Sequence, residues 1–286
     1  MRPDEQAPPN DDGFFERDVA YFRDTQYAST VNLNARVALH ARYSTAQQEW
    51  FAWLADQIDW SSSRDVLEVG CGTGLFWTHV PPTVGRHILL TLTDLSQAMV
   101  DTAVSRARTS VHDVKGFTAD VRRLPFDDAS FDLVFANHML YHVADPSTAI
   151  GEIARVLRAD GMFVASTNGP GHLKELYDID AAVFGASEVR NNNAVVFGSI
   201  SGVPLLQRSF GEIEWRSHED RLVCTEPDDI VVYLTSVPPG ERASPSQLAQ
   251  LHTEVRRRVA DGGGALAVSK DAGAFIARDP SFAHSN

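Results

Sequence analysis

Cysteine is scarce in this sequence of 286 residues, in which only Cys71 and Cys224 occur. Two thiols that lie far apart in the chain indicate neither a disulfide framework nor a cysteine-based metal site, and they fit a reducing cytoplasm. The HExxH pattern of a zinc centre is also missing among the ten histidines. His138 and His142 alone would supply two ligands. We therefore expect a cytoplasmic protein without a metal site.

Long apolar runs and an excess of positive charge are absent as well. No stretch of about 18 apolar residues occurs, and residues 1–12 lack the apolar segment of a signal peptide. Asp and Glu total 38 against 25 Lys and Arg, which gives a formal net charge of −13. A nucleic-acid enzyme needs Lys and Arg facing the phosphates, and the densest basic cluster, residues 256–258, is typical of a solvated helix face. We expect neither a membrane nor a nucleic-acid partner, and the oligomeric state does not follow from the sequence.

The most informative motif is a glycine turn after an apolar strand. Residues 65–69 predict a buried strand that contains Glu68, and Gly70, Gly72 and Gly74 follow it. Glycine permits positive φ angles and leaves no Cβ between the backbone and a ligand. A dinucleotide fingerprint would be G-x-G-x-x-G, but Leu75 occupies the position of its third glycine. The spacing favours a nucleoside-type ligand, and a strand-to-helix turn without any ligand is the alternative.

Polar side chains follow the next three predicted strands in the same way. Residues 87–94 are mostly apolar and end at Asp94, where a carboxylate can accept both hydroxyls of a ribose. Ser96 can cap the following helix by itself, which weakens the alternative that Asp94 is only a cap. Asp120 ends a short strand over residues 116–121, and Asn137 follows a buried strand over residues 131–136. Because ligands of such sheets bind beyond the carboxyl ends of the strands, these groups should share one site.

Together these motifs resemble those of class I S-adenosylmethionine-dependent methyltransferases, of the small-molecule, methyltransferase type 11-like kind. The resemblance rests on residues 68–74, 94–99, 119–121, 124–132 and 152–161. It implies S-adenosylmethionine as cofactor, S-adenosylhomocysteine as its product, and an α/β fold: a Rossmann-like, doubly wound, mostly parallel seven-stranded sheet whose last strand is antiparallel. It also implies cofactor contacts, with Glu68 and Asn137 at the methionine end, the backbone of Gly70, Cys71, Gly72 and Gly74 beneath it, Asp94 on the ribose, and Leu95, Met99, Asp120 and Val121 at the adenine.

Periodicity and composition divide the chain into five parts. We expect a disordered N-terminus over residues 1–12, an N-terminal helical lid over 13–60, the Rossmann-like core over 61–168, a substrate-side insertion and helix after the fifth strand over 169–210, and C-terminal strands and helices over 211–286. In this class the segment before the sheet commonly folds over the cofactor, so Tyr27, His40 and Arg42 are candidates to close the site. Surface positions are the alternative for all three. In the last part we predict separate strands over 212–218 and 221–225 and a hairpin over 266–269 and 274–277.

Methyl transfer from a sulfonium is an in-line displacement, in which the protein mainly aligns the reacting atoms and excludes water. A general base helps where the nucleophile carries a proton, and His138 and His142, with Tyr141 between them, follow the fourth strand. These side chains could instead pack against the cofactor or cap a helix. The sequence therefore predicts methylation of an O, N or C atom of a small molecule of the biosynthetic or natural-product kind. A non-catalytic module that binds the cofactor is the alternative, and an oxidoreductase is a weaker one because of Leu75.

Overall fold

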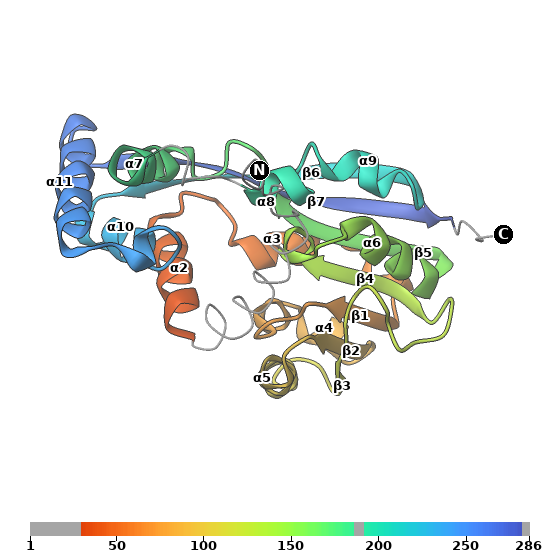
Figure 1. Cartoon of the computed structure of the whole chain (residues 1–286). Coiled ribbons are helices and arrows are strands. Elements are labelled where there is room, and N and C mark those ends of the chain that lie inside the picture. The colour runs from red at the N-terminus through yellow and green to blue at the C-terminus, as the bar shows by residue number, and fades with distance from the viewer. Residues whose placement is uncertain (1–29, 186–191, 282–286) are drawn as a thin grey trace, which may run out of the picture.

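The computed structural model of the chain describes residues 30–185 and 192–281. Within them, seven strands form one sheet in the order β3-β2-β1-β4-β5-β7-β6, and β7 runs antiparallel to both of its neighbours, β5 and β6. The predicted α/β fold, with its mostly parallel sheet and antiparallel last strand, is therefore confirmed (Figure 1). The strands are β1 Asp65–Val69, β2 Leu89–Asp94, β3 Asp113–Thr118, β4 Phe131–Asn137, β5 Leu157–Asn168, β6 Phe210–Cys224 and β7 Leu266–Pro280.

Four of the described α-helices begin at residues whose side chains satisfy free backbone N–H groups. Glu49 accepts from the first turn of α3, Ser96 from α5 and Asp145 from α6, while Ser244 and Gln247 form a capping box at α11. The described α-helices are α2 Thr30–Tyr43, α3 Trp50–Asp56, α4 Pro82–Gly85, α5 Gln97–Ala107, α6 Pro146–Val156, α7 Lys174–Phe184, α8 Asn192–Phe197, α9 Gly202–Leu206, α10 Pro227–Leu234 and α11 Pro245–Asp261.

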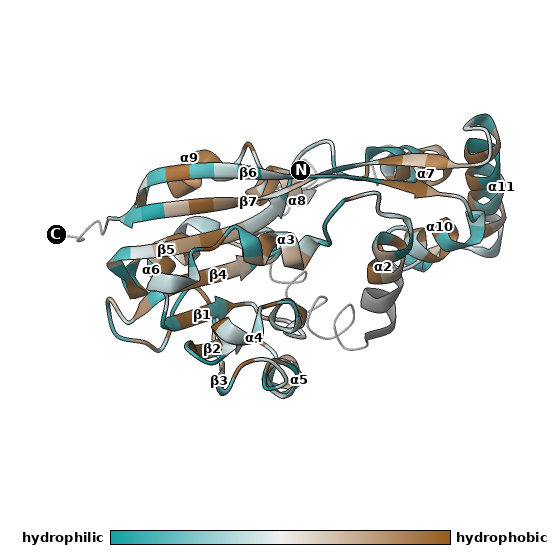
Figure 2. Cartoon of the chain, turned by 180° about the vertical axis from the view of Figure 1, so that it is seen from behind, coloured by the Kyte–Doolittle hydropathy of each residue, from teal (hydrophilic) through white to brown (hydrophobic). Residues whose placement is uncertain are grey.

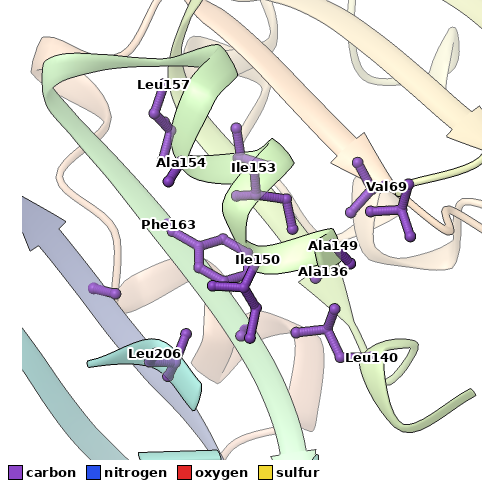
Figure 3. Close-up of a cluster of buried hydrophobic side chains, with 14 of the residues drawn as sticks. Val69, Ala136, Leu140, Ala149, Ile150, Ile153, Ala154, Leu157, Phe163 and Leu206 are labelled. Atoms are coloured by element: carbon purple, nitrogen blue, oxygen red, sulfur yellow. The ribbon is translucent and has the colours of Figure 1, made fainter. Parts of the chain in front are cut away.

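Two hydrophobic clusters cover the two faces of the sheet. On one face Ile150, Ile153 and Ala154 of α6 pack against Phe163 of β5, and all four side chains are buried (Figure 3). On the other face Leu54 of α3, with Phe76 and Trp77 of the turn after β1, packs against the strands. Burial on both faces explains why the central strands are almost uniformly apolar.

A third cluster forms beyond the carboxyl ends of the parallel strands. It joins α2, α7, α10 and α11 to the far halves of β6 and β7, which extend past the other strands (Figures 1 and 2). We call these four helices and strand halves the outer lobe. Its buried members include Leu39, Leu176, Leu222, Leu251 and Val268. The lobe therefore has a hydrophobic core of its own and faces the strand ends where the polar groups were predicted.

None of the described helices is both long and apolar enough to cross a bilayer.

Several predicted elements of the last part of the chain were wrong. The pairing of β6 with β7 runs without a break from Glu212 opposite Arg278 to Cys224 opposite Leu266, so no hairpin lies within 266–277 and no gap separates 212–218 from 221–225. Gly273, which suggested a turn, lies within β7, where a Cβ would come within 2.5 Å of the Trp215 ring. The glycine therefore makes room for the Trp215 side chain of the paired strand, and it does not form a turn. The third strand also ends earlier than predicted, at Thr118, so that Asp120 lies in the following loop.

Candidate functional site

Glu68 lies in the centre of the site, at the end of β1, and its side chain is almost fully buried. Trp77 Nε1 donates to one carboxylate oxygen over 2.5 Å, and Asn137 Nδ2 donates to the other over 2.8 Å. Burial raises the pKa of Glu68 to about 7, while these two hydrogen bonds act in the opposite direction. The carboxyl group is thus held in one orientation and carries a proton about half of the time near neutrality. Trp77 was not found from the sequence, where nothing distinguishes it from a core residue.

The glycine turn after β1 has positive φ angles at Gly70, Gly72 and Gly74, of 62°, 51° and 67°. A Cβ at Gly70 would lie 2.8 Å from Met139 Cε, and one at Gly74 would lie 2.8 Å from Ala103 Cα. At Gly72, by contrast, a Cβ would meet no described atom within 4 Å. Gly70 and Gly74 are therefore required by packing, while Gly72 presents bare backbone to open space. That open face is where a ligand could lie on the turn.

The second strand holds this turn in place. The backbone N–H of Cys71 donates to the Thr93 carbonyl over 2.9 Å, and the N–H of Gly72 donates to Asp94 Oδ2 over 3.0 Å. The other oxygen of Asp94 accepts from the Ser96 backbone over 2.9 Å. Burial raises the pKa of Asp94, although these N–H groups favour its charged form. Ser96 caps α5 as expected, so Asp94 is not needed as the helix cap.

The residues assigned to the adenine lie beyond β2 and β3. Leu95 is 50% exposed, which is unusual for a leucine beside a buried strand, whereas Met99 and Val121 are buried. Asp120 forms an ion pair with Arg122, whose Nη2 lies 2.7 Å from Oδ2, and this hydrogen bond lowers the pKa of Asp120. Arg122 was missed from the sequence, although its position two residues after Asp120 allows this pairing. Leu95 offers an apolar surface to a flat ring.

The segment after β4 begins with strained backbone. His138 has a φ of 51°, and its N–H donates to the Ser166 carbonyl over 3.1 Å. Its half-buried ring lies 5.2 Å from that of Trp50 and 6.4 Å from that of Tyr141. Burial lowers the pKa of His138 to about 4, with a smaller contribution from the charge of Lys270. The imidazole is therefore neutral at physiological pH.

A single 3-10 turn, Leu140–His142, follows His138. It places the ring of His142 4.5 Å from that of Tyr141, and it extends from the strand end at Asn137. Tyr141 thus lies between the two histidines, and His138 is the one that faces Trp50 of α3. The predicted catalytic residues are brought together on one side of Glu68, and their roles stay predictions.

Arg42, a candidate from the N-terminal part, is not brought to this centre. Tyr27 lies outside the described residues. Arg42, in α2, forms an ion pair with Asp229 of α10, with Nη1 2.6 Å from Oδ2, and Tyr43 donates to the same oxygen over 2.6 Å. In this structure Arg42 therefore joins two helices of the outer lobe. Across residues 30–185 and 192–281, His, Cys, Asp and Glu form no group of three or more that could hold a metal ion.

The comparisons with known proteins agree with this geometry. Residues 67–165 match the family model of a methyltransferase domain. Over 117 residues the chain is 37% identical to a malonyl-[acyl-carrier protein] O-methyltransferase of Methylovorus sp., and the match covers 39% of each protein. Over 106 residues it is 34% identical to a probable S-adenosylmethionine-dependent methyltransferase of Mycobacterium tuberculosis, covering 37% of this chain and 36% of that protein. The chain thus spans less than half the length of these two relatives.

Among solved structures, the [4+2]-cyclase SpnF superposes with a TM-score of 0.55 at 20% identity, covering 91% of this chain and 94% of that chain. A likeness at this identity shows the fold alone. Residues 67–165 are therefore similar to a methyltransferase domain, and the sheet order agrees with the class I fold expected from the sequence.

Proposed function

We propose that this protein transfers the methyl group of S-adenosylmethionine to an O, N or C atom of a small-molecule acceptor by in-line displacement. The observation that carries the proposal is the open backbone at Gly72, which lies between the fixed carboxyl groups of Glu68 and Asp94. Both flanking glycines are closed by packing, so the one open position is the one over which a nucleoside would lie.

Each residue of this half of the site fits one part of the cofactor. Asp94 can accept hydrogen bonds from both ribose hydroxyls, and the exposed side chain of Leu95 can cover the adenine. Glu68, held by Trp77 and Asn137, can attract the ammonium group of the methionine end. When bound, the cofactor supplies a methyl group that is already activated by the positive sulfur. The chain's own contribution is alignment, which can lower a barrier by roughly 7 to 11 kcal/mol.

Proton removal from the acceptor is the second task, and we assign it to His138, His142 or Tyr141. His138 is neutral at physiological pH because burial lowers its pKa to about 4, so its ring is free to accept a proton. A base of such low pKa holds the proton weakly, which limits the help it gives to a poorly acidic hydroxyl or amine. His138 therefore serves best with an acceptor that is acidic or already ionised.

Calorimetry and a transfer assay test the proposal in two steps. S-Adenosylmethionine and S-adenosylhomocysteine are titrated into the full chain, and labelled methyl transfer is then measured with free and thioester-linked acyl acceptors, alcohols and amines. Thioesters are included because one relative is named for malonyl-[acyl-carrier protein]. Binding of both nucleosides with turnover of one acceptor class supports the proposal. Binding without any turnover favours a non-catalytic binding module, and absence of binding rejects both.

A further inference from the structure

Buried polar atoms without a partner gather on the acceptor side of the site. Nδ1 of His40, His172 and His218 and Nε1 of Trp50 are buried, and no described residue forms a hydrogen bond with them. The rings are neighbours, since Trp50 lies 5.2 Å from His138 and 5.3 Å from His218, and His40 lies 6.3 Å from His172. Unpaired buried polar groups cost free energy, so such a set is expected where a ligand supplies the missing partners.

Strand register places this set directly beside the predicted methyl-transfer position. Asn137, which holds Glu68, pairs with Ser166 of β5, and Asn168, two residues further along, pairs with Ala272 of β7. Ala272 in turn pairs with His218 of β6. The ends of β4 and β5 and the middle of β6 and β7 thus form one row, and α2, α3 and α7 lie along it (Figure 1).

Lys270 supplies N–H groups to this region that its ion pair does not use. Its ammonium lies 3.0 Å from Asp220 Oδ2, and the two side chains are only 9% and 1% exposed. Asp220 also accepts from the backbone N–H groups of Thr45, Ala46 and Arg221 and from the Ser44 hydroxyl, at 2.7 to 3.0 Å. The carboxylate is therefore saturated, whereas the described residues give the ammonium one carboxylate partner for its three N–H groups. The charge of Lys270 acts on His40, His138 and His172.

The hydrogen-bonding capacities of the set favour an anionic ligand. Trp50 Nε1 and the Lys270 ammonium can only donate. Burial lowers the pKa of His172 well below its usual value, and the charge of Lys270 acts in the same direction, so the ring is neutral. His218 donates Nε2–H to the Gln48 carbonyl over 3.0 Å, which leaves its Nδ1 as an acceptor. Trp50 Nε1 and the Lys270 ammonium, which can only donate, thus favour a ligand that accepts hydrogen bonds, while His218 Nδ1 remains an acceptor.

We propose that His40, Trp50, His138, His172 and Lys270 form the acceptor site, and that they bind a carboxylate whose oxygen is methylated. This assignment rests on the methyltransferase function proposed above. One carboxylate oxygen accepts from Trp50 and Lys270, and the other faces the methyl group near Asn137. A C–O bond forms to the methyl carbon while the carbon–sulfur bond breaks and its electron pair stays on sulfur. The products are a methyl ester and S-adenosylhomocysteine, and no proton moves, which agrees with the weak basicity of His138.

Methyl-ester formation tests the acceptor class. The full chain is incubated with methyl-labelled S-adenosylmethionine and benzoate, octanoate, malonate or the malonyl thioester of N-acetylcysteamine, each run beside the corresponding amide. We expect label that is released as methanol by mild base, from a carboxylate and not from its amide. Equal labelling of the amides overturns this inference and not the proposed function. The same holds if protein that binds S-adenosylhomocysteine labels no carboxylate. Failure to bind S-adenosylhomocysteine overturns the proposed function as well.

Matched tryptophan variants test the site. Trp50→Phe keeps the aromatic ring and removes the unpaired N–H, and Trp53→Phe makes the same change in the same helix at an N–H that is not in the buried unpaired set. We expect KM for the carboxylate to rise about tenfold or more in Trp50→Phe, the usual loss for a donor to a charged group. Affinity for S-adenosylhomocysteine should be unchanged in both variants. An unchanged KM in Trp50→Phe, or an equal rise in Trp53→Phe, overturns the assignment of the site.

Discussion

Gly72 and Gly74 offer a sharp test, because the same substitution should have different effects two residues apart. Both glycines have positive φ angles, of 51° and 67°, so alanine at either position costs about 1 to 2 kcal/mol of folding free energy. At Gly74 the new Cβ would also lie 2.8 Å from Ala103 Cα and 3.1 Å from its carbonyl oxygen. Overpacking adds about 1 to 3 kcal/mol, so Gly74→Ala should lose about 2 to 5 kcal/mol in total.

Gly72→Ala meets no such obstacle in the free protein, because no described atom lies within 4 Å of the new Cβ. The methyl group would instead occupy the space over the turn. In the complex, this methyl group would clash with the bound ligand and destabilise the complex by about 1 to 3 kcal/mol, the usual cost of overpacking. S-Adenosylhomocysteine binding would therefore be weakened roughly 5- to 150-fold.

Urea denaturation and titration calorimetry measure the two quantities separately. Gly72→Ala should be the more stable of the two variants and should still show weakened S-adenosylhomocysteine binding relative to the wild type. If folded Gly72→Ala protein bound S-adenosylhomocysteine as tightly as the wild type, the backbone at this turn would not be the floor of the cofactor site. A stability loss as large as that of Gly74→Ala would refute the structural argument for open space at Gly72.

Three further predictions concern the neighbouring groups. Asp94→Ala removes a charged acceptor and should weaken S-adenosylhomocysteine binding by about 1.5 to 3 kcal/mol in calorimetry, so an unchanged Kd would remove Asp94 from the site. Because the pKa of Glu68 is raised to about 7, the carboxyl is mostly protonated at pH 6 and must ionise to attract an ammonium group. Affinity should therefore be about tenfold weaker at pH 6 than at pH 8, and Glu68→Gln should remove this dependence; a variant that kept it would point to another group. Ile153→Ala should lower the unfolding free energy by about 2 to 5 kcal/mol in urea titrations without changing S-adenosylhomocysteine affinity, and a loss below about 1 kcal/mol would contradict the packing of α6.

The core of the fold could be predicted because its signals are local. Strands buried on both faces are continuous apolar runs, and Ser96 caps the helix that follows the second strand, as expected. The hairpin expected over 266–277 was wrong for a non-local reason. Gly273 accommodates the Trp215 side chain of the paired strand, and one sequence position cannot distinguish that packing from a turn.

The candidate site divides in the same way. Glu68, Gly72, Asp94 and Asn137 could be named in advance because each lies at or just after the end of a parallel strand, where the topology alone brings them together. The acceptor side could not, since Trp50, His172 and Lys270 come from segments far apart in the sequence that meet only through the outer lobe. Nor does the sequence indicate that Arg42 pairs with Asp229, 187 positions away.

The two long strands have a mechanical consequence. β6 and β7 have 15 residues each, which corresponds to about 50 Å, and their ladder continues from the sheet into the outer lobe. Because this ladder is shared by the sheet and the lobe, moving the outer lobe away from the sheet as a rigid body would break hydrogen bonds in the middle of the ladder. The acceptor site proposed above would then keep a fixed distance from the strand ends, because the lobe cannot move as a rigid body without breaking that ladder.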